Sequence, residues 1–298
     1  MINIDLHIHS KYSLDGEFTP TEIIDFASKS DIEYLSITDH NTVKGVQEAI
    51  DYAKDRNITV IPGIEIDCLY KNSTLHILGY FIDHNNPIYK ELEETISNRE
   101  KDAGITRLKL IEELGFKVDM DKLKVDAPDG IYTGRMLACN ILNNELNKDN
   151  PIVKNYIDNK DSYFNINNVF HSDYFDKGKP AYVKVEYISL EDGMKIVKDT
   201  GGLVILAHPG KDTKENLNLL NEIMSLGFDG LEAYSSYHSN IQKEFYRTYA
   251  IKNDYLMTLG SDFYGKAKPS ISLSSVISDL CCKRMIKTLE NYQTNKNI

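Results

Sequence analysis

The sequence lacks any apolar run long enough to cross a bilayer, and its first five residues lack the features of a signal peptide. Cysteine is scarce and forms no C-x-x-C pair; the four cysteines are Cys68, Cys139, Cys281 and Cys282. The adjacent pair near the C-terminus has poor geometry for a disulfide. These absences predict free thiols in a reducing compartment, hence a cytoplasmic protein with no membrane partner.

An excess of basic residues is also missing. The chain has 34 Lys and Arg against 45 Asp and Glu, which gives a net charge of −11. Proteins that bind long duplex nucleic acid usually carry a basic surplus, because phosphate contacts dominate their affinity. The acidic balance therefore argues against a long duplex as partner. It still allows a small anionic substrate, because bound divalent metals supply positive charge that the composition does not count.

Seven short apolar, β-branched runs are present, and most are followed by a helical pattern. Two capping patterns, at residues 19–22 (Thr-Pro-Thr-Glu) and 189–192 (Ser-Leu-Glu-Asp), mark helix starts. This alternation predicts an α/β fold with a parallel sheet, and the number of units favours a barrel over an open sheet. The runs span residues 3–8, 34–38, 59–66, 74–82, 203–207, 230–234 and 255–259.

Residues 87–180 interrupt this alternation. They are polar, follow a helical pattern and contain no convincing buried strand, and residues 143–150 are rich in Asn and Asp. We therefore expect residues 1–86 and 181–298 to form the barrel. The segment 87–180 is expected to be a helical insertion that covers the active-site end.

His7-Ile8-His9 ends the first apolar run. Because alternate residues of a strand share a face, both imidazoles point toward one centre, and Asp5 lies on the same side. Neutral imidazoles are good ligands for zinc, manganese or iron. The pattern alone is weak evidence for a metal site.

The recurrence of such residues is stronger evidence. Side chains that bind metals fall at almost every predicted strand, mostly at the C-terminal end, where barrel enzymes build their active sites. Buried charges without a metal are costly, so a set of this size predicts a metal centre. Besides the two histidines of the first strand, the set contains Asp15, His40, Glu65, His76, His208 and Asp262.

Other polar residues near these strands are expected to have different roles. Asp5 and Asp39 are expected to orient imidazoles rather than to bind metal. Glu232 is open between such a role and a purely structural one. His84 and His171 have no motif around them, and we expect both at the surface.

These motifs resemble the PHP family, named for polymerase and histidinol phosphatase. The resemblance covers the predicted barrel from end to end and implies a distorted seven-stranded β/α barrel with a trinuclear metal site. The matching pieces are DLHIHS at 5–10, SLDG at 13–16, ITDH at 37–40, GIE at 63–65, His76, AHP at 207–209 and GSDFYG at 260–265.

The family also implies which residues bind which ion. One ion would take His7, His9, Glu65 and Asp262. Glu65 would bridge to a second ion, which also takes His76 and His208. Asp15 and His40 would hold a third ion.

Tyr264 departs from the family pattern GSDFHG, in which His at this position binds the third ion. A phenol with an ordinary pKa of about 10 binds metal well only as phenolate, and its ionisation near pH 7 costs about 4 kcal/mol. We therefore expect the third site to be weaker than the other two. Tyr264 would instead donate a hydrogen bond to the phosphate or to the leaving oxygen.

The sequence resembles most closely the subgroup that acts on nucleoside 3′,5′-bisphosphates and on short RNA 5′ ends, which has a helical insertion at the same place. Arg99 and Arg135 resemble the phosphate-binding arginines of that insertion. Residues 178–183 and 237–239 also have counterparts there. The subgroup thus implies Arg99, Arg135 and His238 as substrate-binding residues, and His238 and Tyr264 as candidate catalytic residues.

The sequence therefore predicts a phosphoesterase that uses two to three divalent ions (manganese, zinc or iron). Its expected partner is a small phosphorylated substrate, a nucleotide or short RNA, cleaved as a phosphate monoester by a metal-bridged hydroxide. Three alternatives remain open: a histidinol-phosphate-type or other small-molecule phosphatase, an amidohydrolase acting on C–N bonds, and a non-catalytic metal-binding protein. Glu65, the TDH motif at 38–40 and the Asp15 loop argue against the amidohydrolase.

Overall fold

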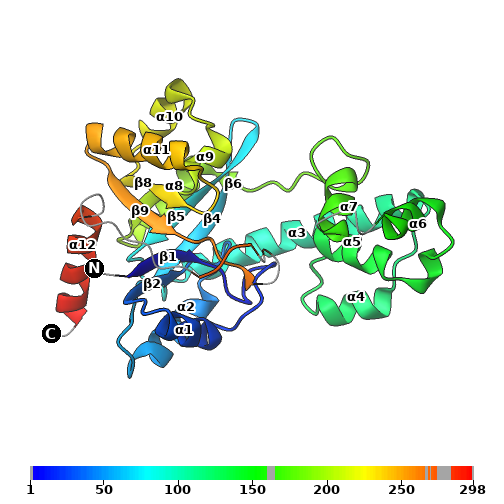
Figure 1. Cartoon of the computed structure of the whole chain (residues 1–298), viewed down its shortest axis with the longest axis horizontal. Coiled ribbons are helices and arrows are strands. Elements are labelled where there is room, and N and C mark those ends of the chain that lie inside the picture. Colours follow the sequence, from blue (N-terminus) through cyan, green and yellow to red (C-terminus); the bar gives the residue numbers. More distant parts are fainter. Residues whose placement is uncertain (1–2, 160–164, 266–267, 269, 274–282, 297–298) are drawn as a thin grey trace. The chain divides into compact units, whose positions relative to one another are not determined.

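The computed structural model describes residues 3–159, 165–265, 268, 270–273 and 283–296 (Figure 1). The chain forms two compact units, one made of Met1–Glu93 and Tyr187–Ile298 and the other of Glu94–Glu186. None of the helices in the described ranges is long and apolar enough to cross a membrane. Cys68 and Cys139 are free thiols, as expected. The Cys281-Cys282 pair lies outside the described residues.

The first unit begins with a small parallel sheet in which the strands follow chain order. Helix α1 starts at the predicted capping box, where the Thr19 side chain accepts a hydrogen bond from Glu22 N and the Glu22 carboxylate accepts one from Thr19 N. A buried apolar cluster that includes Ile23 and Leu35 joins sheet and helices. The elements are β1 (Ile4–Ile8), α1 (Pro20–Lys29), β2 (Tyr34–Ile37), α2 (Lys44–Ala53) and β3 (Thr59–Val60).

The same unit contains a larger, mixed sheet with the strand order β6-β4-β5-β7-β8-β9. Strand β5 is antiparallel to both of its neighbours, and the other pairs are parallel. The strands are β4 (Gly63–Tyr70), β5 (Ser73–Tyr80), β6 (Ile188–Ser189), β7 (Leu203–Leu206), β8 (Gly230–Ser235) and β9 (Leu256–Gly260). The helices are α8 (Leu190–Asp199), α9 (Pro209–Asp212), α10 (Leu217–Met224), α11 (Asn240–Lys252) and α12 (Lys283–Lys296). Helix α8 starts at the predicted cap, Ser189.

The α/β class is confirmed, but among the described residues the hydrogen-bonded ladders form two sheets and do not close into one parallel barrel. The pattern predicts a single strand over residues 59–66, whereas the structure divides it into β3 and β4. Pro62 has no N–H to donate, so the ladder breaks there. Only Lys71 and Asn72 join β4 to β5. A link of two residues makes an antiparallel hairpin, because a parallel crossover needs a dozen residues or more.

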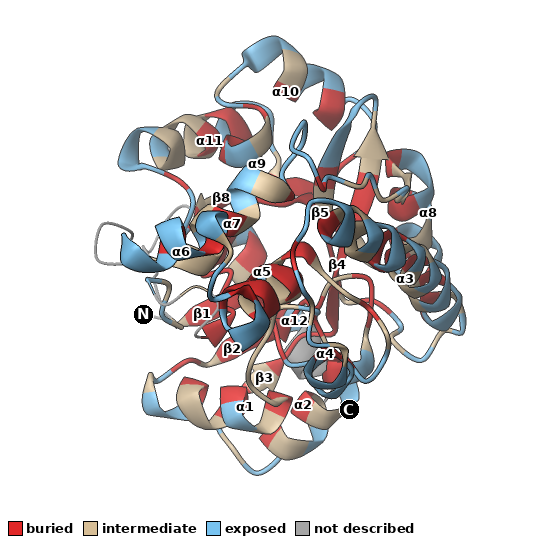
Figure 2. Ribbon diagram, turned by 90° about the vertical axis from the view of Figure 1, so that its right-hand side faces the viewer, coloured by how far each residue is buried: buried red, intermediate tan, exposed pale blue. Residues whose placement is uncertain are grey.

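The two sheets meet at two isolated bridges, Ile8 with Phe263 and His40 with Glu65. At the first, Asp262 N donates to His7 O at 2.8 Å. At the second, Glu65 N donates to Asp39 O at 3.2 Å. The residues at these bridges are mostly buried, as are the strands that lead to them (Figure 2). The metal-type residues in or just after β1, in β4, and just after β2 and β9 therefore gather where the sheets adjoin.

In the unit Glu94–Glu186, all of the regular elements among the described residues are helices, joined by turns and loops. It has its own apolar core, in which Phe116, Leu137 and Phe170 are buried. That its residues cover the active-site end stays a prediction. Its helices are the end of α3 (Ile88–Glu113), then α4 (Met120–Asp126), α5 (Gly134–Leu142), a 3₁₀ turn (Glu145–Asn147), α6 (Pro151–Asp158) and α7 (Ile166–Tyr174).

Candidate active site

The first group of metal-type atoms combines β1, β4 and the end of β9. His7 and His9 each direct Nε2 toward two carboxylate oxygens, Glu65 Oε2 and Asp262 Oδ1. The four N–O distances lie between 3.0 and 3.3 Å. Ligands that each lie about 2.0–2.2 Å from one metal are separated from one another by about this much. All four residues are buried and form a group that could hold an ion.

The other nitrogen of each imidazole is held in place. His7 Nδ1 lies 3.1 Å from Glu232 Oε1, and His9 Nδ1 lies 2.9 Å from Ser13 Oγ. Such partners fix the ring orientation and leave Nε2 free to bind a metal. Glu232 Oε2 also accepts a hydrogen bond from His208 N at 2.8 Å. Glu232, whose role the sequence left open, therefore orients the His7 ring and anchors the chain at His208.

The second group shares Glu65 with the first. Its Oε1 atom lies 2.9 Å from His76 Nδ1 and 3.1 Å from His208 Nε2. The two oxygens of Glu65 thus face different groups, Oε2 toward the first and Oε1 toward the second. This arrangement is the one that a carboxylate bridging two ions requires.

A third group consists of His40, Asp67 and His76. His40 Nδ1 lies 3.0 Å from Asp67 Oδ1, and His76 Nε2 lies 3.3 Å from the same oxygen. Asp67 is missing from the set that the sequence predicted. A signal for it exists, because Glu65 and Asp67 are two residues apart on β4 and share a face. His76 lies directly opposite Asp67 in the β4–β5 ladder.

The donor atoms fit a metal. Burying a polar atom without a hydrogen bond is costly, so unpartnered buried atoms in a native fold need an explanation. Here such atoms converge on the three groups, which a set of cations would explain. They include His7 Nε2, His9 Nε2, His40 Nδ1, Glu65 Oε2, Asp67 Oδ1 and Asp262 Oδ1.

The backbone is specialised around these ligands. A Cβ atom at Gly260 would lie 2.2 Å from His7 Cβ, so the close approach of β9 to β1 requires glycine there. His208 and Asp262 have positive φ angles of 26° and 54°. Non-glycine residues rarely adopt such angles, and they do so most often at functional sites. Asp5 supports this junction by accepting hydrogen bonds from the backbone N atoms of His7 and Ser261.

The charges of the groups are strongly coupled. Burial lowers the pKa of His7, but Glu232, Glu65 and Asp262 together raise it well above its ordinary value. Burial likewise opposes protonation of His40, yet Asp67 and Glu65 raise its pKa to about 10. Burial raises the pKa of Glu65, and the surrounding imidazoles hold it well below the usual range. Without a metal, the carboxylates therefore favour protonated imidazoles, whose positive charge balances theirs.

Three predicted residues have other partners. His238 is buried, and both ring nitrogens contact the backbone, Nδ1 lying 3.0 Å from Ala233 O and Nε2 accepting from Gly210 N at 2.9 Å. It thereby anchors the turn after His208 and offers no free nitrogen to a phosphate in this structure. Asp15 is in none of the three groups. Burial lowers the pKa of His40, whereas Asp67 and Glu65 raise it; Asp15 raises it too, by a smaller amount. Asp39 binds Ser10 N and Oγ rather than an imidazole.

Tyr264 lies inside the cluster. Its ring stacks on His9 with centroids 4.0 Å apart, and its hydroxyl lies 3.0 Å from His40 Nε2. Burial raises the pKa of this phenol well above 10, and Asp262, Glu65 and Asp15 raise it further. In the absence of a metal, these effects favour the neutral phenol.

Lys268 lies beside the first group, although no pattern in the sequence pointed to it. Its ammonium lies 3.2 Å from Asp262 Oδ2 and 3.6 Å from the centroid of the Tyr264 ring, and it also contacts the Tyr237 hydroxyl. Burial lowers the pKa of this lysine. No sequence motif marks this residue.

The remaining predicted residues belong to none of the three groups. Arg99 and Arg135 belong to the helical unit, where Arg99 donates to Glu186 O and Arg135 donates to Asn168 Oδ1 at 3.0 Å. His84 and His171 are partly exposed and lie in no metal-type group.

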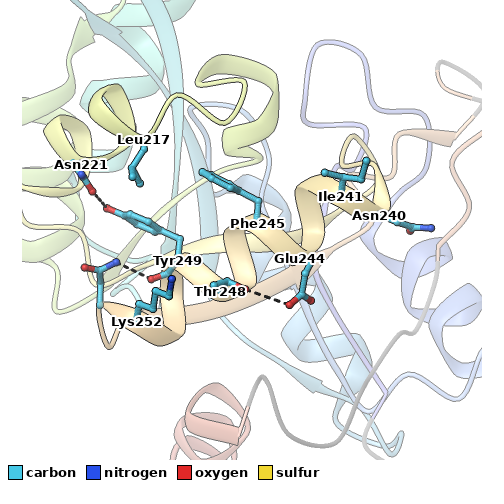
Figure 3. A pocket seen from close by; sticks show the side chains of 10 residues that line it. Leu217, Asn221, Asn240, Ile241, Glu244, Phe245, Thr248, Tyr249 and Lys252 are labelled. Atoms are coloured by element: carbon cyan, nitrogen blue, oxygen red, sulfur yellow. Dashed lines mark hydrogen bonds between the residues drawn. The ribbon is translucent and has the colours of Figure 1, made fainter.

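An apolar groove between α10 and α11 is a separate feature (Figure 3). Leu217 comes from α10, and Ile241, Phe245 and Tyr249 come from α11. None of the metal-type residues lines this groove. It is therefore not the candidate active site.

The pKa of His40 gives a testable pH dependence for the metal-free protein. A histidine whose folded pKa is raised stabilises the fold fully below its unfolded pKa of about 6.5, and this contribution is lost as the pH rises through the folded value. For His40 the window runs from the unfolded value to about 10. We expect the melting temperature of chelator-treated protein to fall across this window, and less steeply in His40→Asn. Equal slopes for the two proteins would contradict the assignment.

Comparison with known proteins places the fold and cluster in a family. Residues 5–271 match the PHP domain. A 3′,5′-nucleoside bisphosphate phosphatase of Chromobacterium violaceum is 30% identical over 267 residues, which covers 89% of this chain and 88% of the relative. A 5′-3′ exoribonuclease of Haemophilus influenzae is 28% identical and covers 87% of this chain and 89% of that protein.

A solved structure agrees in fold along almost the whole chain. It comes from Chromobacterium violaceum and is described as an amidohydrolase with bound sulfate and no metal. The TM-score is 0.79 at 28% identity, and the match covers 97% of this chain and 96% of the other. With the PHP domain matched over most of its length and a 30% identical relative aligned along most of both sequences, the chain belongs to the PHP domain family.

Proposed function

We propose that this protein removes phosphate from small nucleotides, such as nucleoside 3′,5′-bisphosphates, or from short oligonucleotides. Its family and relatives make it a hydrolase of phosphate esters, and the proposal concerns which esters and which residues. The observation that carries it is the convergence of three metal-type groups on Glu65 and its neighbours. Zinc, manganese and iron all suit such histidine and carboxylate donors.

We assign two ions to the groups that share Glu65. His7, His9, Glu65 and Asp262 would hold one ion, and Glu65, His76 and His208 would hold the other. When bound, such a pair lowers the pKa of a shared water and neutralises charge on the phosphoryl oxygens. Glu65 would keep the two ions together through its two oxygens, while Glu232 keeps Nε2 of His7 available.

We propose Lys268 as the residue that donates a proton to the leaving oxygen and neutralises its negative charge. Its ammonium sits beside Asp262 and over the Tyr264 ring, and its side chain is 22% exposed. A lysine with a lowered pKa gives up a proton more readily than an ordinary one. We propose that Lys268 donates to a phosphoryl or leaving oxygen, a role for which the sequence offered Tyr264 and His238 as candidates.

The choice of nucleotide substrates rests on the relatives and on charge. One relative is named as a phosphatase of nucleoside bisphosphates and the other as an exoribonuclease that works from the 5′ end. The net charge of −11 disfavours a long duplex, which needs an extended basic surface. The helical unit would supply Arg99 and Arg135, because a guanidinium offers two parallel hydrogen bonds to a phosphate.

Amide hydrolysis is the second candidate, because a similar structure is described as an amidohydrolase. The two activities differ in the bond that is cleaved and can be separated directly. We expect manganese-loaded protein to release inorganic phosphate from a nucleoside 3′,5′-bisphosphate and from short 5′-phosphorylated RNA, but not to cleave duplex DNA. Asp262→Asn should abolish phosphate release while circular dichroism stays unchanged. Hydrolysis of an amide panel without phosphate release would overturn the proposal.

The role of Arg135 has its own test. Arg135→Ala should raise KM for the bisphosphate about tenfold to a hundredfold, the usual loss for a charge-assisted hydrogen bond. Metal content should stay unchanged, because no metal-type group contains the residue. Arg247→Ala is a matched control, since Arg247 is a partly exposed arginine of α11 that pairs with Glu244 and belongs to no metal-type group. An unchanged KM in Arg135→Ala would remove this residue from substrate binding.

A further inference from the structure

Asp67 presents an unpartnered carboxylate oxygen to the cluster. The residue is 7% exposed, and its Oδ1 atom has no hydrogen bond. Two imidazole nitrogens lie beside that oxygen, His40 Nδ1 at 3.0 Å and His76 Nε2 at 3.3 Å. His40 Nδ1 also lacks a hydrogen-bond partner. Three donor atoms on different strands and loops thus face one point.

The other oxygen of Asp67 is fixed by Asn41. Asn41 Nδ2 donates to Asp67 Oδ2 at 2.8 Å, and Asp67 N donates to Asn41 Oδ1 at 3.0 Å. Asn41 is itself anchored, because its backbone N donates to Glu65 O at 2.7 Å. Its φ of 57° lies in the left-handed region that Asn tolerates. This clamp aims Oδ1 at the two imidazoles, as the outer partners of metal-binding carboxylates do.

His40 is oriented toward the same point. Its Nε2 atom lies 3.0 Å from the Tyr264 hydroxyl, which is buried and fixed by stacking on His9. If Nε2 carries the proton and donates it to the phenol oxygen, Nδ1 keeps a free lone pair facing Asp67. A tyrosine in place of the family histidine then acts as a hydrogen-bond partner rather than as a ligand.

We propose that Asp67 is a metal ligand, whose Oδ1 binds a divalent cation together with His40 Nδ1, and that Tyr264 positions His40 for this role. The inference deepens the proposed function and rests on it for the other two ions. An imidazole and a carboxylate suit manganese, iron or zinc. Asp67 supplies a carboxylate where Tyr264 leaves the family's third site one imidazole short. We therefore expect the third ion to bind more firmly than the weak site that the sequence predicts.

His76 is shared between two groups. Its Nδ1 atom faces Glu65 and its Nε2 atom faces Asp67. A neutral imidazole has one lone pair, so when Nδ1 serves the ion assigned to Glu65 and His208, Nε2 carries the proton and donates it to Asp67 Oδ1. Asp67 belongs to the third group only, so its loss affects one ion and leaves the first group of ligands intact.

The test counts manganese ions bound by metal-free protein, using calorimetric titration and elemental analysis without substrate. Asp67→Asn keeps the shape and removes the charge. It should lose about one ion at concentrations that saturate the wild type, with that ion at least about 100-fold weaker, since even indirect partners of a metal contribute 10–100-fold. Asp229→Asn is the control, because this half-buried carboxylate accepts a hydrogen bond from Val204 N and lies in no group. An unchanged count and affinity in Asp67→Asn would overturn the proposal.

A second variant decides the matter if Asp67→Asn does not fold. Asn41→Gly tolerates the positive φ and removes only the clamp, so it should weaken the same ion about 10–100-fold. Unaltered affinity in that variant would also overturn the proposal.

Tyr264→Phe should weaken this ion as well, because it removes the hydrogen-bond partner of His40. Metal binding to the wild type should give no phenolate absorbance, which direct coordination of Tyr264 would produce. Because no step uses substrate, loss of an ion in Asp67→Asn stands even if phosphate release is never found. Conversely, if Asp67→Asn retains every ion and still releases phosphate, the role of Asp67 is wrong while the proposed function stands.

Discussion

The buried negative charge of Glu65 is the constraint on which the site depends. Its side chain is fully buried, and taking a carboxylate out of water costs several kcal/mol unless positive charge surrounds it. Five imidazoles lie 2.9–3.3 Å from its two oxygens, those of His7, His9, His40, His76 and His208. Neutral imidazoles cannot compensate the charge. The compensating positive charge must come from protons on these rings or from bound cations. Only bound cations leave the ring nitrogens unprotonated and able to act as ligands.

The architecture follows from bringing these groups to one carboxylate. The bridge between His40 and Glu65 and the bridge between Ile8 and Phe263 join the edges of two sheets. A buried carboxylate that belongs to none of the three metal-type groups holds the chain in place near these junctions. Asp39 accepts hydrogen bonds from Ser10 N and Oγ, both at 2.6 Å. Such networks position the ligands before any ion arrives, which lowers the cost of ordering them.

The parts of the structure that local chemistry determines could be predicted from the sequence. The cap at Thr19 and the metal-type residues at strand ends depend on neighbours a few residues away. The division at Pro62 and the hairpin at Lys71-Asn72 carried local signals too, but the regular alternation of strands and helices obscured them. The roles of Lys268 and His238 depend on contacts between distant segments, which no motif records. Asp67 is an intermediate case, because its spacing from Glu65 was visible whereas its approach to His40 was not.

The most direct measurement of the central claim is the metal content of Glu65→Gln. Glutamine keeps the volume of the side chain and removes the charge, so the fold should persist. Because Glu65 belongs to both of the groups assigned to the catalytic pair, the account predicts that both ions weaken together when metal-free protein is titrated with manganese. The ion held by His40 and Asp67 should be retained better than either of them. Loss of a single ion, with the other of the pair bound as tightly as in the wild type, would contradict a bridging role for Glu65.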